Sequence, residues 1–225
     1  MKTQLNRAQA RKSSESGMTL IEVIIVSALM VAASGTFMLV ANGASGLAEQ
    51  SIEATQLHQR STSALARIVG ALRTGSLSSF QPALDPELPI FTSDLTSMLV
   101  TGTDIDGASL GSPVRIWSEL DPLELDDAID NDGDGLIDER QVSLTVDSGL
   151  AGERTIVIAK NVAEYSGGET ANGIDDNGND LADERGLAFW LTDSVLHVRL
   201  TVEHQTTRGD VLQVTRESSI NIKNQ

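Results

Sequence analysis

Residues 17–41 read GMTLIEVIIVSALMVAASGTFMLVA, and the interpretation of the whole chain depends on this stretch. Residues 18–41 are almost all apolar or small, and no proline interrupts them. A helix of that length reaches about 36 Å, enough to cross a hydrocarbon core of about 30 Å. One ionisable residue, Glu22, lies inside the run. A carboxylate in a membrane segment costs about 2.5–3.5 kcal/mol on insertion scales, so Glu22 is a functional candidate that needs a partner.

The segment before the apolar run is polar and basic. It carries four basic residues and one acid, which are Lys2, Arg7, Arg11, Lys12 and Glu15. A secretory signal has its small-residue cleavage site after the apolar region, whereas Gly17 lies before it. By the positive-inside tendency, residues 1–17 stay in the cytoplasm and the rest of the chain lies across the membrane.

Residues 17–23, GMTLIEV, resemble the class III signal of type IV prepilins and type II secretion pseudopilins. The resemblance implies that residues 1–17 are a leader, that a prepilin peptidase cuts after Gly17, and that the new N-terminus at Met18 is methylated. In an assembling filament, the Met18 amine would meet Glu22 of a neighbouring subunit in apolar surroundings. Such a pair gains from low dielectric, and each charge is expensive to bury alone, so the pair would set the register between subunits. Met18 stands where the family usually has Phe. The simpler alternative is an ordinary single-pass anchor with a chance Gly and Glu.

An amphipathic helix is expected over residues 42–75, following the membrane half at 18–41. Two glycines within residues 42–46 predict a bend or local melting there. Beyond them, apolar and small residues recur at steps of three and four, which predicts one face packed on a sheet. This stripe consists of Ala54, Leu57, Ser61, Ala64, Leu65, Ile68, Val69 and Leu72. Gly75 is expected to end the helix in a left-handed conformation.

The rest of the chain divides into a variable connecting region, 76–112, and an antiparallel β domain, 113–225. The first is rich in Ser, Thr, Gly, Asp and Pro, so at most short strands are expected. In the second, hydrophobicity alternates with period two, which predicts a sheet with one buried face covered by the helix. The predicted strands are 113–118, 141–146, 155–159, 187–191, 195–203, 211–215 and 219–222. In 195–203 the even-numbered apolar residues are expected to face inward, and His197, Arg199 and Thr201 outward. The predicted fold is therefore α+β and similar to the pilin fold.

Two acidic segments, 124–140 and 169–185, form an internal repeat. They read ELDDAIDNDGDGLIDER and ETANGIDDNGNDLADER. In the first copy, acids at alternate positions are followed by a turn glycine, Gly135, and such oxygens converge when a loop wraps an ion. The expected ligands in this copy are Asp127, Asp130, Asp132, Asp134, Leu136 through its carbonyl, Asp138 and Glu139. In the second copy they are Asn172, Asp175, Asn177, Asn179, Leu181, Asp183 and Glu184.

Hard oxygen donors without nearby His or Cys favour calcium, in one or two ions with a structural role. The loops resemble Asp-rich, Gly-punctuated calcium loops of extracellular bacterial proteins. Weaker binding is expected in the second copy, which has fewer carboxylates and has Asp180 in place of the turn glycine. The alternative is a pair of solvated acidic turns.

The composition of the chain argues against several classes of function. The 225-residue chain has a formal net charge of −16 and no cysteine, which argues against direct nucleic-acid binding and excludes disulfides. The three histidines, His58, His197 and His204, are scattered, and no catalytic motif accompanies them, so an enzyme is not expected.

The resemblance implies a minor pilin or minor pseudopilin, a structural subunit of a type IV pilus or type II secretion pseudopilus. It would pass once through the bacterial inner membrane, with its C-terminal domain periplasmic, and then enter a periplasmic or surface filament. Its partners would be other pilin or pseudopilin subunits and the prepilin peptidase. The alternative is a membrane-anchored calcium-dependent adhesin or binding module exported by the same route.

Overall fold

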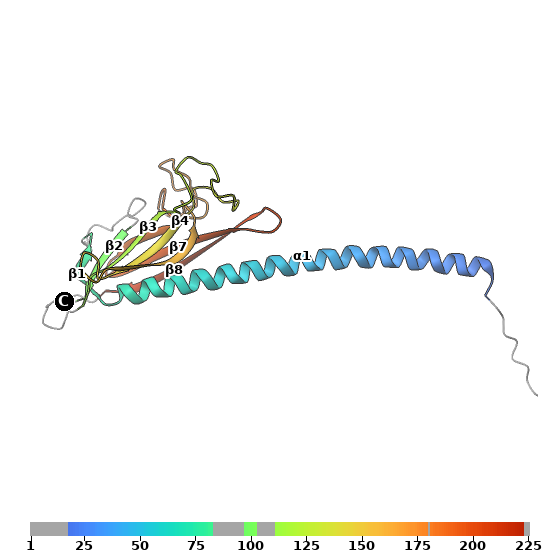
Figure 1. The fold of residues 1–225 in the computed structure, drawn as a ribbon, viewed down its shortest axis with the longest axis horizontal. Coiled ribbons are helices and arrows are strands. Elements are labelled where there is room, and N and C mark those ends of the chain that lie inside the picture. Colours follow the sequence, from blue (N-terminus) through green and yellow to red (C-terminus); the bar gives the residue numbers. More distant parts are fainter. Residues whose placement is uncertain (1–17, 83–96, 103–110, 180, 223–225) are drawn as a thin grey trace, which may run out of the picture. The chain divides into compact units, whose positions relative to one another are not determined.

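The computed structural model describes residues 18–82, 97–102, 111–179 and 181–222 (Figure 1). The predicted leader, including Gly17, lies outside the described residues, as does Asp180. The chain forms two compact units, Met1–Glu49 and Gln50–Gln225.

Helix α1 (Leu20–Leu72) begins with a capping box. The Glu22 carboxylate accepts hydrogen bonds from the Thr19 backbone N–H at 2.7 Å and from its hydroxyl at 2.9 Å. In return, the Glu22 N–H donates to the Thr19 hydroxyl at 3.4 Å. The part of α1 in the first unit is long and apolar enough to cross a membrane, and its large apolar side chains are exposed. The helix continues through residues 42–46, so the local melting predicted there was wrong.

In the second unit, the described residues form eight strands in one antiparallel sheet, which confirms the α+β class. The strands are β1 (Gly75–Gln81), β2 (Ser97–Gly102), β3 (Val114–Leu120), β4 (Arg140–Val146), β5 (Arg154–Val162), β6 (Leu187–Thr192), β7 (Val195–Gln205) and β8 (Val211–Asn221). Their order is β1-β2-β3-β4-β5-β7-β6, and β8 pairs with β7 along its length. The sheet thus begins inside the region predicted to be connecting. The two strands predicted over 211–222 are one strand, β8.

The core lies between the sheet and the C-terminal part of α1, which runs beside β8 in Figure 1. The predicted helix stripe is confirmed, because its residues from Leu57 to Leu72 are buried. On β7 the predicted inward face is confirmed as well, since Leu196, Val198 and Leu200 are fully buried. Apolar residues spaced three and four apart share one face of a helix, and apolar residues spaced two apart share one face of a strand. The sequence pattern therefore predicted which faces are buried.

The predicted left-handed cap at Gly75 was wrong, because Gly75 already belongs to β1. A glycine is needed there for a different reason. A Cβ at this position would lie 2.7 Å from Val100 Cγ1 and 2.9 Å from the Phe80 ring. Close packing of the first two strands therefore requires a residue without a side chain.

Candidate metal centre

The two acidic loops leave the same end of the sheet. The first loop (124–140) follows β3 and leads into β4, and the second loop (169–185) follows β5 and leads into β6. Each is closed at its base by one backbone hydrogen bond, from Asp121 N–H to Glu139 O at 3.0 Å and from Ser166 N–H to Glu184 O at 2.8 Å. Arg140, the first residue of β4, pairs with Val162, the last residue of β5. The sheet therefore brings the bases of the two copies together.

The described residues of the two loops share their backbone turns, so the sequence repeat is also a structural repeat. Positive φ angles recur at equivalent positions: 60° and 75° at Ala128 and Gly173, 82° and 75° at Gly133 and Gly178, 52° and 55° at Asp138 and Asp183. Most side chains disfavour this conformation, so hydrogen bonds must hold it in place.

Two acidic residues in each copy, at equivalent positions of the repeat, accept those hydrogen bonds. Glu124 Oε1 accepts the N–H groups of Asn131 and Asp132, both at 3.0 Å. Its counterpart Glu169 accepts the two equivalent N–H groups at 3.1 and 2.9 Å. Nearer the base, Asp138 accepts from Asp127 and Ala128, and Asp183 accepts from Asn172 and Gly173. These carboxylates shape the loops.

In the first loop, five carboxylates converge. Ligand-capable oxygens of Glu124, Asp130 and Asp132 lie within 4.8 Å of one another, and so do those of Asp132, Asp134 and Glu139. Two of these acids are buried: Glu124 is 4% exposed and Glu139 is 2% exposed. Each has an Oε2 atom that is buried without a hydrogen-bond partner. Buried polar atoms are normally paired, and the combination of these two oxygens with three neighbouring carboxylates points to a missing ligand.

The raised pKa of Glu139 and the lack of ion pairs to the cluster within the described part of the chain also indicate uncompensated negative charge. Burial, with contributions from Asp134, Glu124 and Asp132, raises the pKa of Glu139 to about 7. Among the described residues, no lysine or arginine forms an ion pair with the five acids. Lys160 pairs instead with Asp121, at 3.5 Å. The cluster offers oxygen donors and uncompensated negative charge, so these acids can hold a metal ion.

The structure divides the ligands that the sequence predicted for this copy. Asp130, Asp132, Asp134 and Glu139 come together, although Asp130 also accepts Gly133 N–H at 2.6 Å and Gly135 N–H at 2.9 Å. Asp138 lies outside these groups and turns both oxygens to the main chain. Asp127 accepts from Ile129 N–H at 3.1 Å and from the Asn131 amide at 3.0 Å, so it also serves the loop. Leu136 is buried, and its N–H donates to Asp134 at 2.9 Å.

Sequence reasoning missed Glu124 as a candidate ligand. The signal was present, because a glutamate opens both copies of the repeat. Spacing rules counted only the acids at alternate positions of the turn. Glu124 reaches the cluster from the base of the loop, six residues before Asp130.

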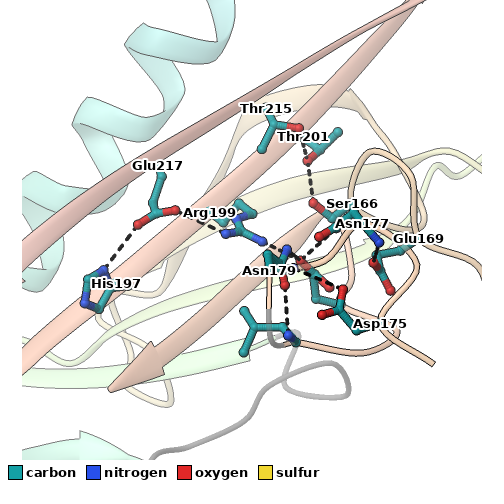
Figure 2. Close-up of polar contacts among 12 residues, drawn as sticks. Ser166, Glu169, Asp175, Asn177, Asn179, His197, Arg199, Thr201, Thr215 and Glu217 are labelled. Atoms are coloured by element: carbon teal, nitrogen blue, oxygen red, sulfur yellow. Dashed lines mark hydrogen bonds and ion pairs between the residues drawn. The ribbon is translucent and has the colours of Figure 1, made fainter. Parts of the chain in front are cut away.

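In the second loop the counterparts of the cluster are arranged differently (Figure 2). Asn177 and Asn179 stand where the first loop has Asp132 and Asp134, and their amide groups donate to Glu184. Glu184 also pairs with the guanidinium of Arg199. Asp175 accepts from Asn179 N–H at 3.1 Å, and Asn172 from Ile174 N–H at 2.7 Å.

No acidic cluster of the kind seen in the first loop occurs here among the described residues, which leave out Asp180. The remaining predicted residues of this copy serve the turn as well. Leu181 N–H donates to Asn179 at 2.9 Å, and Asp183 binds main-chain N–H groups.

The segment that leads from β5 into the second loop explains why one prediction for β7 was wrong. Thr201 was expected to face solvent, but it is fully buried. Its hydroxyl bonds to the hydroxyls of Ser166 at 3.3 Å and Thr215 at 2.9 Å, as Figure 2 shows. The segment between β5 and β6 passes over this face of the sheet, which period-two alternation cannot reveal.

The two distinctive features of the chain are thus a capped apolar helix and a five-acid cluster at one end of a sheet. The capped, membrane-length part of α1 lies in the first unit and the cluster lies in the second. Comparison of the chain with protein-family models, with curated proteins and with solved structures finds no match.

Proposed function

We propose that this chain is a minor pilin or minor pseudopilin, a filament subunit whose first acidic loop binds calcium. The proposal rests above all on residues 17–41, where a basic leader, Gly17, Glu22 and an unbroken apolar span occur together. The exposed apolar side chains of α1 in the first unit support it, because they need cover from lipid or from helices of neighbouring subunits.

The capping box bears on how Glu22 would act. In the single chain, the Glu22 carboxylate has a local partner in Thr19. That partner is neutral, so the negative charge is hydrogen-bonded but not balanced. A neighbouring Met18 amine would supply the opposite charge in an environment where ion pairs are strong. Glu22 thus has a local role in starting the helix and a proposed role in docking subunits.

Calcium is proposed for the five-acid cluster because of its donor set. Calcium takes six to eight oxygen ligands in flexible geometry, whereas magnesium requires a tight octahedron and keeps several waters. Five carboxylates from one loop, two of them buried, provide charge and several oxygens, and water can complete the shell. The ion would neutralise mutual repulsion and fix the first loop at the end of β3 and β4.

The first test of the proposal is the N-terminus of the mature protein. Mass spectrometry of the chain from its native membrane should find a methylated N-terminus at Met18. A chain that still carries residues 1–17, or one cut after residue 41, would contradict the filament proposal.

The second test separates the two roles of Glu22. In Glu22→Gln the side chain still caps the helix, because Gln serves at this position of a capping box, but the charge is gone. The control Thr19→Val keeps the charge and removes the capping hydroxyl. We expect Glu22→Gln to be processed and inserted normally but to enter filaments poorly, and Thr19→Val to enter them well. Equal incorporation of both variants would refute the docking role.

A third test identifies what the helix contacts. A photo-crosslinking amino acid in place of Leu29, an exposed apolar residue of α1, should capture other helical filament subunits. Capture of lipid alone would favour the alternative, an anchored calcium-dependent binding module.

A further inference from the structure

We infer that Arg199 takes the place of a metal ion in the second loop, so that the chain carries one ion-dependent loop and one closed by its own guanidinium. This inference deepens the proposed calcium role and rests on it for the contrast between the loops. Closure of the second loop by Arg199 depends on contacts within the chain and not on calcium.

The two loops differ at equivalent atoms. Asp134 Oδ1 accepts Leu136 N–H at 2.9 Å, and Asn179 Oδ1 accepts the equivalent Leu181 N–H at 2.9 Å. This shared turn fixes the orientation of both side chains. The remaining atom of Asp134 is an acceptor oxygen, Oδ2, which accepts from the Asn161 amide at 2.9 Å and can also accept a cation, whereas in Asn179 it is an N–H₂ donor directed at Glu184. A donor in this place repels a cation, so the turn in the second loop lacks one ligand oxygen of the first.

Glu124 and Glu169, the first residues of the two loops, also differ in whether an oxygen is left for an ion. Glu124 Oε2 is buried without a partner, whereas Glu169 Oε2 accepts Asp183 N–H at 2.9 Å. Both oxygens of Glu169 are therefore used by the main chain of its own loop. In the first loop one carboxylate oxygen at this position remains available to an ion, and in the second loop it does not.

Arg199 supplies the positive charge that the second loop needs. It lies on β7 opposite Ala188 of β6, and only 12% of its side chain is exposed. Its Nη1 bonds to Glu184, and its Nη2 lies 3.2 Å from Glu217 Oε2 on β8. Figure 2 shows the guanidinium between Glu217 and the side chains of the second loop. A guanidinium is always charged and donates in several directions, as this position requires.

The two loops differ in the number of carboxylates at the positions of the cluster. Five equivalent positions carry five carboxylates in the first loop and three in the second, where Asn177 and Asn179 replace two of them. Arg199 then pairs with the most buried of the remaining acids, Glu184, which is 1% exposed. Glu184 Oε2 is still without a partner among the described residues, but its Oε1 accepts from Arg199, Asn177 and Asn179. The second loop is thus stabilised by a cation that belongs to the chain.

Hydrogen exchange of the full chain in detergent, followed by mass spectrometry with calcium or with EDTA, tests this inference. In the wild type, EDTA should speed exchange in residues 124–140 and leave residues 169–185 protected. In Arg199→Gln, exchange in residues 169–185 should rise at least about tenfold with or without calcium, because a buried charge loses its partner. The control Arg208→Gln removes an exposed arginine from the β7–β8 turn and should change neither loop.

The exchange results separate the role of Arg199 in the second loop from the role of calcium in the first. Protection of residues 169–185 that disappears in wild-type EDTA samples, or that survives Arg199→Gln, would overturn the role of Arg199. If residues 124–140 ignore EDTA, the calcium proposal fails while the second-loop result still stands. Should Arg199→Gln disturb the whole sheet, the wild-type calcium count decides, since one ion per chain would support the inference, and two ions or none would contradict it.

Discussion

Glu139→Gln is the most informative perturbation of the first loop. Glu139 is buried, its Oε2 has no partner, and burial with neighbouring acids raises its pKa to about 7. An amide has nearly the same shape, carries no charge and is a poor calcium ligand in place of a carboxylate. We therefore expect Glu139→Gln to fold, to lose calcium binding, and to tolerate EDTA at least as well as the wild type.

The size of the calcium effect follows from mass action. For a dissociation constant of about 10⁻⁴ M, typical of extracellular sites, about 10 mM calcium stabilises the folded chain by about 2.7 kcal/mol. In a domain of this size, 1 kcal/mol corresponds to about 2–4 °C. The melting temperature of the wild type should therefore rise by about 5–11 °C over that in EDTA, and that of Glu139→Gln should not move.

The assay is thermal unfolding of the purified chain by circular dichroism, with calcium or with EDTA. Asp126→Asn is the matched control, because Asp126 is an exposed acid of the same loop and lies outside the cluster. It removes the same charge, so it should keep nearly all of the calcium response. The reasoning is refuted if Glu139→Gln responds to calcium as strongly as the wild type, or if Asp126→Asn loses the response equally.

Two further predictions concern the sheet. Burial raises the pKa of Glu203, although the Gln213 amide at 3.0 Å opposes the shift, so its contribution to stability is present at low pH and is lost as pH rises through the folded-state pKa. Glu203→Gln should therefore melt higher than the wild type at pH above 8 and no higher near pH 4, and a gain of equal size at both would contradict this. A Cβ at Gly186 would lie 1.9 Å from the Ala163 carbonyl oxygen, so Gly186→Ala should cost about 1–3 kcal/mol in denaturant unfolding. Gly70→Ala, in α1 with nothing within 4 Å, should instead stabilise by about 0.5–1 kcal/mol; similar losses in both variants would show that the close contact is not the cause.

Sequence patterns predicted the elements whose partners are set by periodicity. The stripe ending at Leu72 and the inward face of β7 followed from steps of 3.6 and 2 residues. Patterns failed where a distant segment supplies the environment. Thr201 is buried against Ser166 and Thr215, and Gly75 is required by close contact with Val100 and Phe80. No rule of alternation or helix capping contains those contacts.

For the candidate site too, the sequence predicted the local turn but not the contacts made by other segments. Alternate acids identified the turn, because ligand spacing is a local property of the chain. The choice between Asp138 and Glu139 was not local, since it depends on which side chain turns toward the main chain of residues 127–128. Arg199 lies in another strand, and nothing in residues 169–185 indicates that an arginine will face Glu184.

The position of each loop in the sheet accounts for the two ways of closing it. Strand β7 pairs with β5, β6 and β8, so the second loop is tied through Arg199 to the strand with the most neighbours. Opening there would expose Glu184 and break its ion pair with the central strand β7. The first loop joins β3 to β4 and contacts β5 through the hydrogen bond from the Asn161 amide to Asp134 at 2.9 Å, so its release would cost that contact and leave most of the pairing of β3 with β4. The proposed dependence on an external ion would therefore lie in the loop whose opening disturbs fewer strand pairs, while the more central loop would be closed by its own cation.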